Sequence, residues 1–211
     1  MKNLIIVGAG GFGREVLQWV KHINNQVEPT WNVKGFIDDN LNALNGIECD
    51  KSIISTISDY CVYEDDFFTI AIANPLIKKN IVEFLNSKNA KFANIIHPKA
   101  TLSDFCDIGT GVIVTANAKI SPNVKIGNFV TLLGSGVGHD AILNDYCTIT
   151  GYCSINGNVE IGEGAFIGSN SVIAPRKKVG SWAYVGMGSM VITNVKPGTK
   201  VMGNPAKKLN F

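Results

Sequence analysis

Aliphatic residues recur at every sixth position through the second half of this chain. The first series contains Leu102, Ile108, Val114, Ile120, Ile126 and Leu132. The second contains Leu143, Ile149, Ile155, Ile161, Ile167, Ile173, Val179, Val185 and Val191. Neither the period of two of a strand nor the 3.6-residue period of a helix generates this spacing. It is typical of a parallel β-helix with triangular coils, in which each hexad supplies one short strand and one turn. We therefore expect about five coils within residues 98–211.

Small residues accompany the aliphatic series. Glycine often follows the aliphatic residue, where we expect it to supply backbone freedom at the corners. The fifth position of the hexad is usually small: Ala118, Cys147, Cys153, Ala165, Ser171, Ala183 and Ser189. Cys106 shares this position, so we interpret three of the five cysteines as packed, unreactive thiols. An odd number of cysteines without CxxC spacing also argues against a disulfide framework.

The first 97 residues follow a different pattern, in which short apolar runs alternate with amphipathic stretches. We expect strands over residues 2–7, 33–37, 67–73 and 92–96, and helices over 12–23 and from Asn74 onward. Asn74 suits an N-cap, and Pro75 suits the first helical position. We expect this second helix to bury Ile77, Ile81, Phe84 and Leu85. The alternation predicts a Rossmann-like α/β unit over residues 1–97, of mononucleotide-binding size.

Composition and hydropathy exclude several classes of function. The net charge of +2 carries no run of like charges, so we expect no nucleic-acid partner. No apolar stretch approaches the length of a membrane span, and the first apolar run ends at Gly8, which does not fit a signal peptide. We therefore expect a cytoplasmic protein without membrane insertion.

A glycine-rich motif separates the first expected strand from the first expected helix. Gly8, Gly10 and Gly13 form GxGxxG there, and main-chain amides at a helix start can hold a phosphate. A dinucleotide site needs two such halves and this unit supplies one, which favours a mononucleotide over NAD. Asp38 and Asp39 end the second strand, where a carboxylate can reach a ribose or a base edge.

The two sixfold series are out of phase, because eleven residues rather than twelve separate Leu132 from Leu143. The interruption contains His139, followed by Asp140. A histidine beside a carboxylate is a candidate general base, and we expect the repeat to be interrupted at this point. Neighbours on a regular strand point to opposite faces, so the pairing requires a turn at His139. A hydrated corner aspartate stays open as the alternative.

The other two histidines have simpler interpretations. We expect His22 to be a solvated residue of the first helix and His97, which precedes Pro98, to be structural. Only His139 lies within the repeat, so a three-histidine zinc site is hard to assemble. We therefore expect no metal.

Several motifs occur in the order found in one family of hexapeptide-repeat enzymes. They are Ile6-Val7-Gly8-Ala9-Gly10-Gly11-Phe12-Gly13, Gly35-Phe36-Ile37-Asp38-Asp39, Ile96-His97-Pro98, Gly138-His139-Asp140, Gly157-Asn158-Val159 and Gly203-Asn204-Pro205-Ala206. With them the chain resembles the sialic acid O-acetyltransferase (NeuD) and UDP-4-amino-sugar N-acetyltransferase (PglD) family over nearly its whole length. The resemblance implies a left-handed β-helix, a homotrimer with active sites between neighbouring prisms, and acetyl-CoA as co-substrate.

The resemblance also implies roles for particular residues. It makes His139 the general base and Asp140 its partner. The implied acetyl-CoA contacts are Thr148, Ser169, Met187, Gly203, Asn204 and Pro205. The implied sugar-nucleotide contacts are Gly10, Gly11, Phe12, Asp38 and Asp39. Relatives often carry histidine at the position of Phe12, and some carry a second histidine at that of Thr148.

These observations predict an acetyl-CoA-dependent N-acetyltransferase that acts on a UDP-linked amino sugar in surface-glycan biosynthesis. The enzyme alternative is O-acetylation of sialic acid or another sugar hydroxyl, which would not need the nucleotide. The non-enzyme alternative is a binding or scaffold trimer with a vestigial site. The His139-Asp140 pair and the glycine motif count against that alternative. An NAD-dependent oxidoreductase is the least favoured class.

Overall fold

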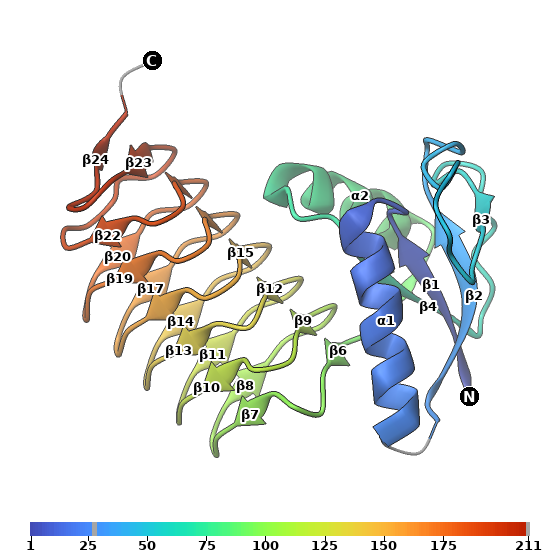
Figure 1. Cartoon of the computed structure of the whole chain (residues 1–211), viewed down its shortest axis with the longest axis horizontal. Helices are drawn as coiled ribbons and strands as arrows, with labels where there is room; N and C mark the ends of the chain where they lie inside the picture. The colour runs from blue at the N-terminus through green and yellow to red at the C-terminus, as the bar shows by residue number, and fades with distance from the viewer. Residues whose placement is uncertain (27–28, 210–211) are drawn as a thin grey trace.

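The computed structural model describes residues 1–26 and 29–209 of the chain. An α/β unit stands at one end of a long triangular prism, and the C-terminal coils lie at the opposite end (Figure 1). Among the described residues, no helix is both long enough and apolar enough to cross a membrane.

The α/β unit contains a five-stranded parallel sheet in the order β3-β2-β1-β4-β5. Its strands are β1 (Lys2–Val7), β2 (Trp31–Ile37), β3 (Ile53–Ser55), β4 (Asp66–Ile70) and β5 (Lys91–Phe92). Helix α1 (Gly11–Gln26) packs on one face, against Leu4 and Ile6, and α2 (Pro75–Ser87) packs on the other, against Ile5 and Val7. β1 is buried on both faces, as its continuous apolar run indicates. The predicted Rossmann-like arrangement is confirmed, with β3 as an additional edge strand.

One expected strand is in fact two. Residues 92–96 contain the end of β5 and the strand β6 (Ile95–Ile96), which belong to different sheets. β5 closes the edge of the α/β sheet, whereas β6 pairs with the first coil of the prism. The chain therefore passes from one unit to the other at Ala93 and Asn94.

Helix α2 begins as predicted but buries a different stripe. The Asn74 side chain accepts hydrogen bonds from the amides of Leu76 and Ile77, as an N-cap should. The buried residues are Pro75, Lys78, Val82 and Leu85. Leu85 is buried as expected, and Ile81 is half-buried. Ile77, however, is 49% exposed and Phe84 38% exposed, so the expected stripe is wrong at these two positions. The reason is that Lys78 occupies the buried face, where the prism offers it acceptors.

The prism consists of short strands that alternate among three faces. The first face contains β6, β9 (Ile113–Val114), β12 (Thr131–Leu132), β15 (Thr148–Ile149), β18 (Phe166–Ile167), β21 (Tyr184–Val185), β23 (Lys200–Met202) and the antiparallel β24 (Lys207–Lys208). The second contains β7 (Thr101–Leu102), β10 (Lys119–Ile120), β13 (Gly136–Val137), β16 (Ser154–Ile155), β19 (Val172–Ile173) and β22 (Met190–Val191). The third contains β8 (Asp107–Ile108), β11 (Lys125–Ile126), β14 (Ile142–Leu143), β17 (Glu160–Ile161) and β20 (Lys178–Val179). The prism is longer than the expected five coils because Ile96 and Val201 extend the interior column at its two ends.

The aliphatic series fills the interior, as predicted. All its members are at most 3% exposed except Leu102 and Ile108, which belong to the first coil. The small fifth positions are buried as well, and burial raises the pKa of the Cys147 thiol to about 12. Cys147 and Cys153 are both free. The predicted packing is therefore confirmed for these two cysteines, whereas Cys106 is only partly buried, and the lack of reactivity of all three stays a prediction.

Glycine has a different purpose at the corners from the one expected. A Cβ added to Gly162 would lie 2.4 Å from the Ser181 amide nitrogen of the next coil, so this position needs a small residue for close stacking. The left-handed backbone conformation occurs two residues later in each hexad, where φ is positive. Asparagine and aromatic residues hold most of these positions: Phe105, Asn117, Asn123, Phe129, Tyr146, Tyr152, Asn158, Asn170 and Trp182.

The strand register locates the missing residue of the repeat. Ile113 pairs with Thr131, eighteen positions on, whereas Thr131 pairs with Thr148, seventeen positions on. β10 pairs with β13 at the same shortened spacing, so the residue is lost between β12 and β13, around Gly134. The expectation that His139 interrupts the repeat is therefore wrong. His139 lies in an ordinary corner, followed by a residue with φ of 59°.

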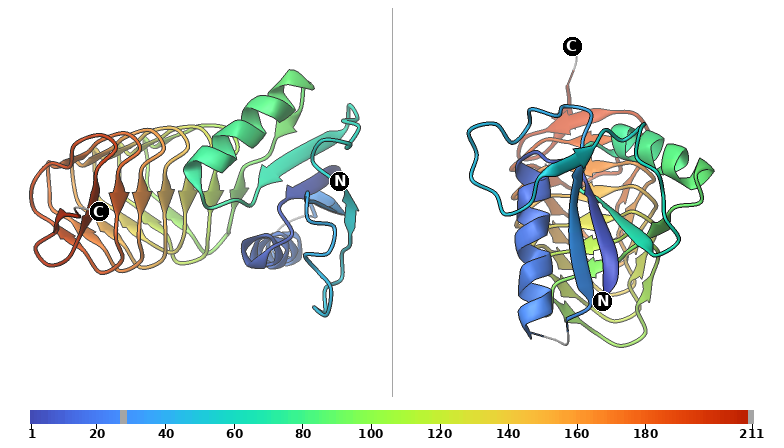
Figure 2. Two further views of the ribbon diagram at one scale, coloured as in Figure 1. Left: turned by 90° about the horizontal axis from the view of Figure 1, so that it is seen from above. Right: turned by 90° about the vertical axis from the view of Figure 1, so that its right-hand side faces the viewer.

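A buried lysine on helix α2 contacts the first face of the prism. The helix lies beside the prism (Figure 2), and Lys78 on it is 1% exposed. Its Nζ donates to the Phe129 carbonyl at 2.8 Å, the Thr148 hydroxyl at 3.0 Å, the Thr131 hydroxyl at 3.1 Å and the Cys147 carbonyl at 3.4 Å. Burial lowers the pKa of Lys78 to about 7.

The lowered pKa of Lys78 makes the free energy of unfolding depend on pH in a defined direction. Between about pH 7 and 10.5 the unfolded chain keeps a proton that the folded chain has lost, so stability rises with pH. The slope is about 1.4 kcal/mol per pH unit. Between about pH 7 and 8.5, the free energy of unfolding of the wild type should rise by roughly 1–2 kcal/mol more than that of Lys78→Met, as measured by urea unfolding. Equal slopes for the two proteins would contradict this assignment.

Candidate active site

His139 and Asp140 form a hydrogen-bonded pair at the edge between the second and third faces, in the corner that joins β13 to β14. His139 Nδ1 lies 2.7 Å from Asp140 Oδ2. This hydrogen bond and a weaker one from the Asn123 amide lower the pKa of the Asp140 carboxyl. An ionised Asp140 favours the tautomer with the proton on Nδ1, which leaves Nε2 free to accept a proton. Both side chains reach solvent, because they are 63% and 46% exposed.

The next coil fixes the plane of the His139 ring. A Cβ added to Gly157 would lie 2.7 Å from Nε2 and 2.8 Å from Cε1 of His139. The Asn158 amide donates to the His139 carbonyl at 2.9 Å. Only a glycine at position 157 therefore leaves room for the ring in this orientation. The spacing of eighteen between His139 and Gly157 carries this information, but the sequence analysis used Gly157 only as a motif residue.

The other histidines lie away from this corner. His97 is 3% exposed, and its Nδ1 accepts from the Lys99 amide at 3.1 Å. Burial lowers the pKa of His97, and the nearby His22 and Lys99 lower it further. His22 is exposed on α1, with its ring edge-on to His97. Both interpretations made from the sequence agree with this geometry. No group of three metal-ligating side chains is found among residues 1–26 and 29–209.

Most of the implied acetyl-CoA contacts follow one edge of the prism, between the first and second faces. Ser169 follows β18, Met187 follows β21 and Gly203-Asn204-Pro205 follows β23, so they lie on successive coils. Met187 is 66% exposed, while the Ser169 hydroxyl donates to Thr150 at 3.0 Å. His139 lies at the other edge of the second face. Within one chain the structure therefore separates the candidate base from these residues by the width of a face.

The Thr148 side chain, for which the resemblance implies a contact with acetyl-CoA, is covered within this chain. Its side chain points outward from the first face, but α2 covers it and it is 0% exposed. Its hydroxyl accepts from Lys78 and donates to the Ala73 carbonyl at 2.9 Å. Nothing in the sequence pattern indicates this cover, because the covering helix comes from a part of the chain some seventy residues away.

The glycine motif forms a tight turn at the carboxyl edge of the α/β sheet. Gly8 has φ of +98°, and a Cβ on Gly13 would lie 1.9 Å from the Gly8 carbonyl oxygen, so helix and turn touch directly. By contrast, nothing lies within 4 Å of a Cβ on Gly10. This open space borders the start of α1, whose first turn contains no acidic residue. Such a helix end attracts phosphate.

Of the two aspartates at the end of β2, Asp38 bonds to this turn, whereas Asp39 bonds to the segment after β3. Asp38 Oδ2 accepts from the Ala9 amide at 2.7 Å, and Asp38 Oδ1 accepts from the Asn40 amide at 2.8 Å. Asp39 Oδ1 accepts from the Ile57 amide at 3.0 Å. The structure thus brings Asp38 to the glycine turn, as predicted, but main-chain amides already bond both of its oxygens.

Of two side chains in the first turn of α1, one is apolar and packed, and the other has a hydrogen-bond donor available for a ligand. Phe12 packs edge-on against Trp19, with ring centroids 5.9 Å apart. Arg14, which the sequence analysis did not consider, has an Nη2 atom 3.8 Å from the position of a Cβ on Gly11. Its buried Nε has no hydrogen-bond partner among the described residues. A cation directly after the third glycine of the motif was the available signal for Arg14.

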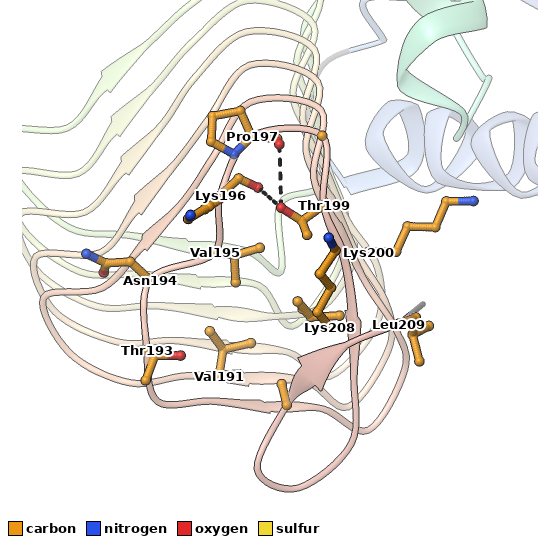
Figure 3. Close-up of a pocket in the computed structure, with 13 residues that line it drawn as sticks. Val191, Thr193, Asn194, Val195, Lys196, Pro197, Thr199, Lys200, Lys208 and Leu209 are labelled. Atoms are coloured by element: carbon orange, nitrogen blue, oxygen red, sulfur yellow. Dashed lines mark hydrogen bonds between the residues drawn. The ribbon is translucent and has the colours of Figure 1, made fainter. Parts of the chain in front are cut away.

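A cavity of about 700 Å³ opens at the C-terminal end of the prism (Figure 3). The valines that end the interior column form its floor, and Lys196, Lys200 and Lys208 surround it. Neither a histidine nor a carboxylate is among its lining residues. We interpret it as the open end of the β-helix rather than as the reaction site.

Comparison with known proteins agrees with this architecture. Residues 3–85 match the family described as the PglD N-terminal domain. The chain is 32% identical to GDP-perosamine N-acetyltransferase of Escherichia coli O157:H7 over 97% of this chain and 95% of that protein.

Solved structures are similar over the whole chain. The acetyltransferase domain of PglB from Neisseria gonorrhoeae FA1090, in complex with acetyl coenzyme A, is 29% identical, with a TM-score of 0.85 and 99% of each chain covered. WeeI from Acinetobacter baumannii AYE is also 29% identical, with a TM-score of 0.86 over 99% of this chain and 100% of that one. These likenesses confirm the predicted fold, an α/β unit followed by a left-handed parallel β-helix.

A methyl group at position 157 should displace the His139 ring. In Gly157→Ala the added carbon would overlap Nε2, so the ring must rotate and lose its hydrogen bond to Asp140. The pKa of Asp140 should then rise towards 3.8, which a carbon-13 NMR titration measures. Gly151→Ala is the control, because nothing lies within 4 Å of its added carbon. An unchanged pKa in Gly157→Ala would mean that Gly157 does not hold the ring.

Proposed function

Because this chain belongs to the PglD/NeuD-type family of hexapeptide-repeat sugar acetyltransferases, we propose that it transfers the acetyl group of acetyl-CoA to an amine of a nucleotide-linked sugar. The full-length likeness to a GDP-perosamine N-acetyltransferase carries this proposal. The acetyl coenzyme A complex of the similar gonococcal domain supports the choice of donor. A cytoplasmic reaction in surface-glycan biosynthesis is part of the same proposal.

The nucleotide is the part of this proposal that departs from the sequence expectation. The resemblance pointed to a UDP-linked sugar, whereas the full-length relative is named for a GDP-linked one. UDP and GDP share a diphosphate group. Three features suit such a group: the open space beside Gly10, the start of α1 without an acidic residue, and the Arg14 side chain. We therefore propose a nucleoside diphosphate as the recognised group. Comparison of UDP- and GDP-linked acceptors decides between the two nucleobases.

His139 acts as the general base in the proposed mechanism. Its Nε2 takes a proton from the sugar amine while the amine nitrogen attacks the thioester carbonyl carbon. A carbon–nitrogen bond forms, the carbon–sulfur bond breaks, and the CoA thiolate leaves and is protonated. Asp140, 2.7 Å from Nδ1, holds the productive tautomer and stabilises the imidazolium. Base catalysis of this kind contributes on the order of 10²–10⁴-fold.

The proposed site needs two copies of the chain. His139 lies at one edge of the second face, and Ser169, Met187 and the Gly203 turn lie at the other. A thioester bound along the edge that carries Ser169 and Met187 cannot meet His139 of the same chain, because the width of the second face lies between them. Three prisms packed around a common axis would bring the unlike edges of neighbours together. We therefore propose a homotrimer with acetyl-CoA between subunits.

Removal of the base should abolish most of the turnover. We expect His139→Ala to lower kcat/KM by about 10²–10⁴-fold, measured as thiol release from acetyl-CoA. The acceptors to compare are UDP- and GDP-linked 4-amino sugars, UDP-linked 3-amino sugars and free sialic acid. His22→Ala, an exposed residue on α1, is the control and should keep wild-type activity. Undiminished activity of His139→Ala would reject the mechanism, and turnover with sialic acid alone would favour O-acetylation.

Mixed trimers should test the shared site. His139→Ala and Ser169→Trp should each inactivate a homotrimer, at opposite edges of the second face. Co-expressed at equal levels, they should regain about a quarter of wild-type activity, because one interface in four combines the two intact edges. Sedimentation should give three times the chain mass of 22.7 kDa. A monomer, or assembled mixed trimers without activity, would remove the shared site from the proposal.

A further inference from the structure

We propose that Lys78 and Thr148 are a positioning pair, which fixes the glycine turn of the α/β unit relative to the prism that carries His139. The inference rests on the proposed function, because it takes the glycine turn as the place where the sugar nucleotide is held. Neither residue touches a substrate in this assignment. Both act by setting where the acceptor is presented.

The lysine half of the pair ties α2 to two consecutive coils. The Lys78 amine lies within hydrogen-bond distance of four acceptors, so each of its hydrogens has a partner whether the amine is charged or neutral. Phe129 and Thr131 belong to one coil, and Cys147 and Thr148 belong to the next. A side chain that is 1% exposed and hydrogen-bonded to two coils favours one position of the helix on the prism. Any slide of the helix leaves a buried amine or a buried carbonyl without a partner, which is costly.

The threonine half continues the contact to the glycine turn. The Thr148 hydroxyl donates to the Ala73 carbonyl at 2.9 Å, in the segment that joins β4 to α2. Two residues earlier, the Ala71 amide donates to the Val7 carbonyl at 2.8 Å. The same segment packs on Gly8, where an added Cβ would lie 2.8 Å from Ile72 Cδ1 and 3.1 Å from the Ala71 carbonyl oxygen. The first face and the glycine turn are thus joined by consecutive direct contacts.

The neighbouring lysine shows what an ordinary contact at this interface is like. Lys79 forms an ion pair with Glu163 at 2.9 Å, and these side chains are 31% and 39% exposed. Exposed pairs of this kind contribute little and leave the geometry loosely defined. Lys78 and Lys79 are adjacent on one helix and both reach the prism, so Lys79 is the matched control for Lys78.

The threonine can be tested with two substitutions that differ in one hydroxyl. Thr148→Val keeps the shape and loses both hydrogen bonds, whereas Thr148→Ser keeps the hydroxyl. We expect kcat/KM for the sugar nucleotide to fall about tenfold or more in Thr148→Val, with a raised acceptor KM. The Kd of acetyl-CoA should stay within about twofold of wild type, and Thr148→Ser should restore most of the acceptor kcat/KM. Lys78→Met should behave like Thr148→Val, and Lys79→Met should not.

Two outcomes would overturn the inference. A weaker acetyl-CoA Kd with an unchanged acceptor KM would place Thr148 in the donor site. A lower melting temperature with both constants unchanged would leave the pair a purely structural role. If Lys78→Met fails to fold, the comparison of Thr148→Val with Thr148→Ser still decides.

Hydrogen exchange separates this inference from the proposed function. Amides of residues 8–13 and 71–78 should exchange faster in Thr148→Val than in Thr148→Ser, and Lys79→Met should match the wild type. If the wild type acetylates no nucleotide-linked sugar, the proposed function fails, yet these exchange rates still report on the pair. Equal rates in both Thr148 variants would overturn the inference, whatever the activity.

Discussion

The stacking of one coil on the next is the constraint on which the rest of this structure depends. Each short strand donates main-chain hydrogen bonds to the next coil and accepts them from the preceding coil, and each interior aliphatic residue packs on its counterpart one coil away. Neighbouring coils approach closely enough that a Cβ on Gly162 or Gly138 would strike the main chain of the next coil. A corner side chain is therefore positioned by the adjacent coils, the one before it and the one after it. The His139 ring over Gly157 is one instance, and the pairing of Asp140 with Asn123 is another.

The same regularity limits what a single prism can do chemically. Side chains at corners form straight rows along the edges, and two rows on different edges remain a face apart at every coil. His139 belongs to one row, and Ser169 and Met187 belong to another. A rigid rod of this kind cannot close around a ligand, as a hinged domain does. Chemistry that needs groups from both rows is possible only where a second prism supplies the missing one.

The α/β unit is held on the prism by both apolar and polar contacts. Part of the contact is apolar, through Phe92, Phe129 and Tyr146. The contact also contains the buried Lys78, whose hydrogen-bond acceptors among the described residues are carbonyl and hydroxyl oxygens rather than carboxylates. A buried charge costs free energy that a packed apolar residue would not, so Lys78 is weak evidence for stability and better evidence for a defined position. Its pKa, lowered to about 7, is the measurable sign of that cost.

The sequence by itself determined the β-helix, the α/β unit, the N-cap at Asn74 and the burial of Cys147 and Cys153, because each depends on neighbours at short or regular spacing. It also singled out His139 and Asp140, although for a reason that the register did not support, since the missing residue lies near Gly134. Only the tertiary structure decided which stripe of α2 is buried, why Thr148 is covered and why Gly157 must be small. Periodicity encodes which residues face the interior of a coil. It carries no information about what covers an outward-facing residue, because the acceptors of Lys78 lie 51 to 70 positions away along the chain.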